Sequence, residues 1–158
     1  MRPWALILGW TAAVFVGGIA AAQAPSEVPF STIAAGKISG VRTLTQIVVR
    51  DAAAWRSLWA RHAGSGVVPP AVDFGREMVI AFYAGAQPQS VVLAIHRIVR
   101  EPERLVVYYM LAATRPLPQP EEGSTITPFQ IVRLPRVALP VAFVLRRTPP
   151  VLRPSPGS

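Results

Sequence analysis

An uncharged run of six apolar residues near the middle of the chain most constrains how this sequence can fold. The run extends from Met78 to Tyr83, with Arg76 and Glu77 before it and Gly85 after it. A short run that contains β-branched and aromatic residues and lies between turn-forming residues is typical of a strand covered on both faces. We therefore expect it to be the central strand of one small domain.

The composition favours strands joined by rigid turns. The chain has 158 residues, enough for one domain of ordinary size. Its apolar share of 51% and charged share of 15% exclude disorder as the overall state. Seventeen prolines argue against a helical bundle. Because there is no cysteine, disulfides, thiolate catalysis and cysteine-based zinc sites are excluded.

Residues 1–22 have the pattern of an export signal. Arg2 and the amino terminus supply positive charge, and the segment from Trp4 to Ala20 is apolar and uncharged. We expect cleavage after Ala22; the alternative is an uncleaved anchor, because the apolar segment is only slightly shorter than a bilayer span. Both alternatives predict that the domain lies outside the cytoplasm, in the periplasm or the extracellular space. An uncleaved segment would then be its one contact with the membrane.

The rest of the chain is expected to form a linker and first strand over residues 23–39, a domain over residues 40–147 and a disordered tail over residues 148–158. Within the linker, residues 24–29 are polar and carry proline. Besides the central strand, the expected strands are 30–35, 43–49, 91–99, 105–113, 127–134 and 141–145. The runs 91–99 and 105–113 are separated by about five residues, which predicts a hairpin, and both faces of the second run are apolar enough to be largely covered.

One helix is expected, beginning at Asp51 and ending at Gly64. The Asp51 carboxylate can accept hydrogen bonds from the free amides of the first turn, and glycine is the usual residue after a helix ends. Large side chains recur at the spacing of a single helical stripe: Trp55, Leu58, Trp59 and His62. A tryptophan pair can bind sugars, but docking of the helix on the sheet explains it better. We expect an α+β fold, mainly antiparallel sheet with one helix packed on it.

Catalytic and metal-binding motifs are not evident. Neither His62 nor His96 has a histidine or carboxylate at ligand spacing, so no metal site is expected. Ser65 lies between glycines but lacks the nucleophile-elbow spacing. Asp73, just before the central strand, fits a structural Asx turn. We expect no enzyme activity and no cofactor; a hydrolase would need a histidine and a carboxylate together in a pocket.

The net charge of +8 raises the question of an anionic partner. Fifteen of the sixteen basic residues are arginine, and they are scattered along the chain. Scattered arginines are more typical of a solvated surface than of a nucleic-acid site, so no nucleic acid is expected. An envelope structural protein that binds an anionic surface is kept as an alternative function.

Three motifs together resemble the PrcB-type protease complex subunit family over roughly residues 40–144. They are D-x-x-x-W-x-x-L-W from Asp51 to Trp59, P-P-x-V-D-F-x-x-E-M-V-I from Pro69 to Ile80 with Asp73 and Phe74, and T-P-F-Q-I-V from Thr127 to Val132. The resemblance implies an exported, non-catalytic accessory domain that associates with an extracytoplasmic protease. Such a domain would stabilise or inhibit its partner.

The loop after the central strand departs from that family. Where the family usually carries a T-G-G-Y-type loop, this chain has Q-P-Q-S. The contact could therefore be lost, directed to another partner, or absent from a protein that keeps only the fold. The residues expected to bind a partner are Gly85, Gln87, Pro88, Gln89, Ser90, Thr127 and Pro128. Pairing of an exposed edge strand is a second route.

Overall fold

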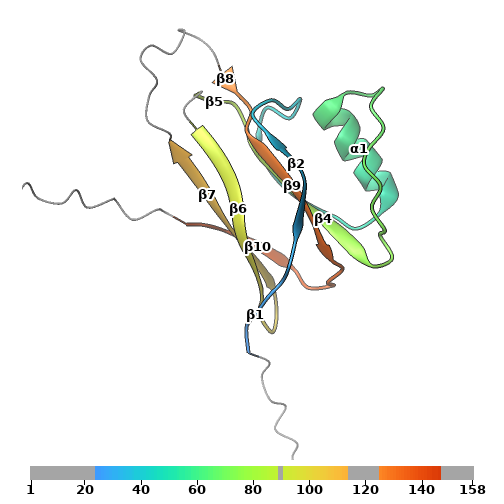
Figure 1. Ribbon diagram of the computed structural model, residues 1–158, viewed down its shortest axis with the longest axis vertical. Coiled ribbons are helices and arrows are strands. Elements are labelled where there is room, and N and C mark those ends of the chain that lie inside the picture. The colour runs from blue at the N-terminus through green and yellow to red at the C-terminus, as the bar shows by residue number, and fades with distance from the viewer. Residues whose placement is uncertain (1–23, 89–90, 114–124, 147–158) are drawn as a thin grey trace, which may run out of the picture.

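One helix and two four-stranded sheets form three stacked layers (Figure 1). The computed structural model describes residues 24–88, 91–113 and 125–146. The inner sheet contains, in order, β2 (Ser31–Gly36), β9 (Phe129–Pro135), β4 (Glu77–Ala84) and β3 (Leu44–Val49). The outer sheet contains β1 (Ser26–Glu27), β6 (Val91–Arg100), β7 (Leu105–Ala113) and β10 (Val141–Leu145). Helix α1 (Ala52–Ala63) covers the inner sheet, and a short pair joins β5 (Gln87–Pro88) to β8 (Thr125–Ile126).

The predicted α+β class is confirmed. Strand pairing is antiparallel everywhere in the described residues except between β7 and β10, which run parallel. The strands form two sheets in place of the single sheet that was expected. The central strand has two apolar faces, and each face needs its own cover: the outer sheet covers one and α1 covers the other.

Strand β4 shows why its sequence is continuously apolar. Every residue from Met78 to Ala84 is at most 3% exposed. Alternate side chains point to opposite faces of a strand. One set packs against the outer sheet, and the other packs against α1 and its tryptophans. The strand is therefore the layer shared by both halves of the core.

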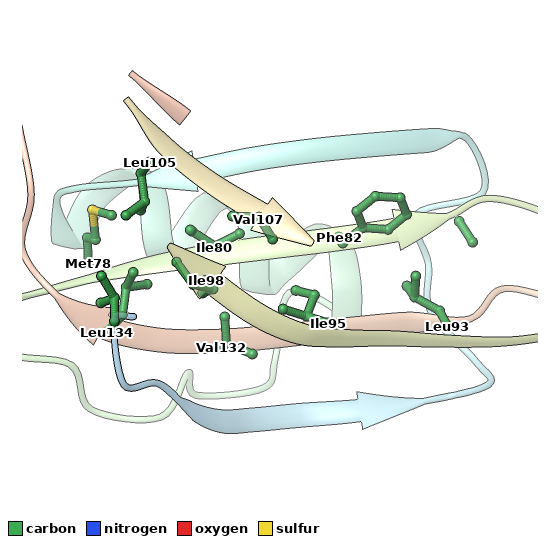
Figure 2. Packing of buried hydrophobic residues seen from close by; sticks show 12 residues of the cluster. Met78, Ile80, Phe82, Leu93, Ile95, Ile98, Leu105, Val107, Val132 and Leu134 are labelled. Carbon is green, nitrogen blue, oxygen red and sulfur yellow. The ribbon is translucent and has the colours of Figure 1, made fainter. Parts of the chain in front are cut away.

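Most of the core between the sheets comes from four strands. Figure 2 shows side chains of β4, β6, β7 and β9 converging between the two layers. The ring of Phe82 lies 4.3 Å from that of Tyr109 and 6.0 Å from that of Phe143, measured between centroids. Full burial of each large apolar side chain is worth about 1.5–3 kcal/mol. This core supplies much of the stability of a chain without disulfides.

Helix α1 begins and ends where the sequence predicts. The Asp51 carboxylate accepts a hydrogen bond from the Ala54 amide at 2.8 Å, and Gly64, with φ of 106°, follows the last turn. Trp55 and Trp59 are 3% and 8% exposed, and their ring centroids lie 5.1 Å apart. Both tryptophans therefore dock the helix on the inner sheet.

The segment before β4 follows its predicted turn. The Asp73 carboxylate accepts a hydrogen bond from the Gly75 amide at 3.0 Å. Phe74 is half-buried beside the tryptophan cluster, and its carbonyl accepts from the Arg136 guanidinium at 2.7 Å. These contacts fix the direction in which the chain enters β4.

The expectation of a linker over residues 24–29 was wrong. Ser26 and Glu27 form β1 against β6, and the Val28 amide donates to the Ile98 carbonyl at 2.9 Å. Val28 is only 8% exposed and belongs to the core between the sheets. Because β2 also pairs along β9, the division expected between residues 39 and 40 is not a break in the fold.

Two further boundaries differ from the expected ones. The strand expected from Thr127 begins at Phe129, because Pro128 has no amide to donate to a ladder. The hairpin of β6 and β7 is present, but β7 is buried on both faces only from Leu105 to Val107, and residues 108–112 are partly or fully exposed. The expected leader and tail lie outside the described residues. No helix within the described ranges is both long and apolar enough to cross a membrane.

Candidate functional site

The two segments expected to bind a partner meet at one end of the domain. We call this the loop end and define it as residues 37–44, 61–64, 85–88 and 125–128. Gln87 pairs with Ile126 and Pro88 with Thr125, so β5 and β8 lie side by side (Figure 1). Gln89 and Ser90 lie outside the described residues. The fold therefore brings together segments that are distant in the sequence.

Gly85 allows the chain to turn sharply after β4. Its φ is +74°, a left-handed value that favours glycine. A Cβ at this position would lie 2.9 Å from the Leu44 nitrogen and 3.1 Å from the Arg42 oxygen. The next amide, of Ala86, donates to the Arg42 carbonyl at 3.0 Å. Gly85 thus holds the end of β4 against residues 37–44.

Buried hydrogen bonds fix the other predicted segment. Thr127 is 6% exposed; its hydroxyl donates to the Ser39 carbonyl at 2.9 Å and accepts from the Ser39 amide at 2.6 Å. The Pro128 carbonyl accepts from the Ala84 amide at 2.9 Å. Gly85, Thr127 and Pro128 are buried supports of the loop end. The exposed residues that they hold in place are the candidates for contact with a partner.

Ser39 also connects the loop end to α1. Its hydroxyl accepts from the Val41 amide at 3.1 Å and lies 2.9 Å from Nδ1 of His62, to which it can donate when the imidazole is neutral. The His62 ring lies 4.3 Å from that of Phe129, measured between centroids. His62 is therefore a half-buried packing residue whose Nδ1 is tied to a loop.

This serine–histidine contact has the geometry of a structural link. Ser39 is 7% exposed. Burial raises the pKa of the neighbouring Tyr83 to about 12, against a smaller opposite effect of Arg61, so the phenol stays protonated at neutral pH. In the described parts of the chain, no carboxylate contacts His62 and no cluster of three metal-ligating side chains is found.

The outer surface of the loop end combines apolar and basic side chains. Ile38 is 84% exposed and Leu44 is 67% exposed. Lys37, Arg42 and Arg61 of the loop end are also exposed. The loop end as defined contains no carboxylate, and residues 114–124, with their acidic pair, lie outside the described residues. The described surface therefore suits a partner with apolar and acidic groups.

We expect His62 to make the stability of the fold depend on pH. Burial lowers its pKa from the usual 6.5. The folded chain then binds fewer protons than the unfolded one, so the free energy of unfolding falls as pH drops below 6.5 and levels off beneath the lowered pKa. His62→Asn should remove this part of the dependence while keeping an acceptor for Ser39. Urea unfolding between pH 5 and 8 measures it.

The control for this prediction is Ser57→Asn, because Ser57 is exposed on the same helix and does not titrate in this pH range. It should leave the dependence as in the unsubstituted protein. Equal pH slopes for the His62 variant and the unsubstituted protein would contradict the prediction.

Residues 37–44 are the part of the loop end that sequence reasoning missed. The available signal was Ile38, an apolar residue among turn-forming neighbours in the segment G-K-I-S-G. The sequence alone does not show that Ile38 is exposed, because its exposure depends on the hydrogen bonds that hold Ser39 to residues distant in the sequence. Comparison of the chain with family models, with curated proteins and with solved structures finds no match.

Proposed function

We propose that this protein is an exported, non-catalytic interaction module that binds a protein partner through the loop end. The partner class that we favour is an extracytoplasmic protease, which the module would stabilise or inhibit as an accessory subunit. One observation carries the proposal: Ile38 and Leu44 are exposed beside basic residues on a frame held by buried hydrogen bonds. The protease itself rests on the motif resemblance.

The physical argument begins with the exposed apolar residues. Covering each of them with a partner would remove apolar surface from water, worth about 1.5–3 kcal/mol per side chain when burial is complete. Because the Ser39 and Thr127 contacts already fix the loop, little conformational entropy remains to be lost on binding. Lys37 and Arg42 add attraction to an acidic partner and speed its encounter.

The second candidate is an envelope protein that binds an anionic surface. The net charge of +8 supports it. Binding of this kind should collapse between about 0.05 and 0.5 M salt, because the Debye length shortens over that range. Binding through Ile38 and Leu44 should persist at the higher salt concentration.

In-cell crosslinking of the tagged protein, followed by quantification of the captured proteases, tests the proposal. We expect the double variant Ile38→Ser, Leu44→Ser to recover at least about tenfold less protease. Two single variants outside the loop end serve as controls and should recover as much as the unsubstituted protein. They are Val68→Ser, at a residue 85% exposed, and Arg76→Glu, at a side chain 89% exposed.

The proposal fails if the unsubstituted protein captures no protease in cells and none in a pull-down from the exported fraction at low or high salt. It also fails if the double variant captures as much protease as the controls. Capture of anionic lipid or polymer that is lost at high salt would support the second candidate instead.

A further inference from the structure

Strand β10 leaves one edge of the outer sheet open. It pairs in parallel with β7, and no strand of the described chain pairs with its other side. The ladder starts with the Leu105 amide donating to the Pro140 carbonyl at 2.8 Å and ends with the Arg146 amide donating to the Tyr109 carbonyl at 2.7 Å. Alternate residues of a parallel strand bond to one neighbour. The backbone groups of Val141, Phe143 and Leu145 therefore point to the open side.

This edge lacks the protection that sheet edges usually have. Strand β1 has only two residues, and β2 is interrupted by a register shift between Thr32 and Ala34. Strand β6 is interrupted by a register shift after Ile95, where the Gln130 side chain accepts from the Ile95 amide at 2.6 Å. By contrast, β10 reads V-A-F-V-L, without charge, glycine, proline or register shift.

Exposed apolar side chains lie next to the open edge. Val144 and Leu145 of β10 are 39% and 45% exposed. Strand β3, at the edge of the inner sheet, also pairs on one side only, but it carries Thr45 and Gln46 among its residues. The outer sheet therefore offers the more apolar edge for an added strand.

The charges around β10 favour a partner over a second copy of this chain. The turn before β7, beside Val141, carries Glu101 and Glu103. Glu101 pairs with Arg104 at 2.7 Å, so the positive groups that flank β10 are Arg50 and Arg146. The Arg50 guanidinium donates to the Leu139 carbonyl at 2.9 Å, just before β10, and the Arg146 guanidinium carbon lies 4.7 Å above the Tyr108 ring, just after it. A second copy would bring its own positive edge and its own net charge of +8 to this site.

We propose that β10 accepts an extended segment of a partner polypeptide as a further strand of the outer sheet. The segment carries apolar residues at alternate positions and acidic residues at its ends. Backbone hydrogen bonds to Val141, Phe143 and Leu145 give the affinity, and the flanking arginines give the preference for acidic ends. The inference rests on the proposed function for its protein partner, but it assigns a surface other than the loop end.

Amide hydrogen exchange followed by NMR tests this with a defined probe. The probe is a nine-residue peptide with two glutamates at each end and alternating valine and threonine between them. We expect the amides of Val141, Phe143 and Leu145 to exchange rapidly in the free protein and at least tenfold more slowly with saturating peptide. The amides of Ala142 and Val144, which face β7, should already be slow. A peptide with lysines for the glutamates should bind at least tenfold more weakly.

A substitution of the protein isolates the backbone contribution. Leu145→Pro removes an outward amide and keeps the ladder to β7, as prolines on sheet edges do. It should weaken peptide binding at least tenfold, whereas the control Leu145→Thr keeps the amide and should stay within threefold. If Leu145→Pro does not fold, N-methylation of alternate peptide residues replaces it: one alternate set should abolish binding and the other should not.

Three results would overturn the inference. Protection of Leu44, Gln46 and Val48 in place of the β10 amides would assign the edge of β3. Protection of the β10 amides that rises with protein concentration and needs no peptide would assign a second copy. Binding of the peptide without protection at either edge would exclude strand addition.

The two proposals fail in distinguishable ways. If Leu145→Pro still captures protease in cells while the peptide shows no protection of β10, the edge inference fails and the proposed function stands. If no protease is captured by any version of the protein, the proposed function fails, whatever the peptide result.

Discussion

Replacing Phe82 with alanine should lower the free energy of unfolding by about 3–5 kcal/mol. The side chain is 1% exposed and lies between the two sheets, with ring centroids 4.3 Å from Tyr109 and 6.0 Å from Phe143. Removing the ring loses its transfer free energy and leaves a cavity that β4, fixed on both faces, cannot readily fill. A domain of this size has a total stability of about 5–15 kcal/mol, so the variant should be close to unfolding.

Urea unfolding followed by fluorescence measures this loss, because Trp55 and Trp59 are buried in the fold. The control is Val144→Ala, at a residue 39% exposed, which should change the free energy of unfolding by about 0.5 kcal/mol. A Phe82 variant as stable as this control would show that the two sheets are not packed on each other as described.

Among alanine substitutions at Gly85, Gly64 and Gly66, we expect the one at Gly85 to lower the free energy of unfolding most. At Gly85, a left-handed φ of +74° coincides with backbone atoms 2.9–3.1 Å from the added Cβ. Gly64 has a positive φ of 106° but open space, and Gly66 has open space and no positive φ. The three variants therefore separate backbone strain from steric overlap.

The expected losses in the free energy of unfolding increase from Gly66 to Gly64 to Gly85. Gly66→Ala should be neutral or stabilising by up to about 1 kcal/mol. Gly64→Ala should lose about 1–3 kcal/mol from strain alone, and Gly85→Ala about 2–6 kcal/mol from strain and overlap together. Chemical unfolding measures all three. Equal losses at Gly64 and Gly85 would contradict the close approach of β4 to residues 37–44.

Sequence reasoning located the elements whose signals are local. The run from Met78 to Tyr83 lacks the alternation of apolar and polar residues that a half-buried strand has, so it predicts a strand covered on both faces. Asp51 and Gly64 mark the two ends of the helix. These signals lie within single elements. They do not depend on which other element covers the strand.

The features that sequence reasoning missed depend on distant pairings. Ser26 and Glu27 have no strand-like pattern, and they become a strand only because β6 offers them an open edge. The link between Ser39 and His62 joins residues 23 positions apart, across β3 and most of α1. No local pattern encodes such a contact, and the exposure of Ile38 depends on it.

The position of β1 would set the orientation of the domain if the amino-terminal segment acted as an anchor. Ser26 pairs with Arg100 at the pole opposite to β5 and β8 (Figure 1). A chain tethered by its amino-terminal segment would therefore be held at that far pole. The loop end would then lie at the pole away from the tether. Tethering and partner binding would thus be mechanically compatible, with each assigned its own pole.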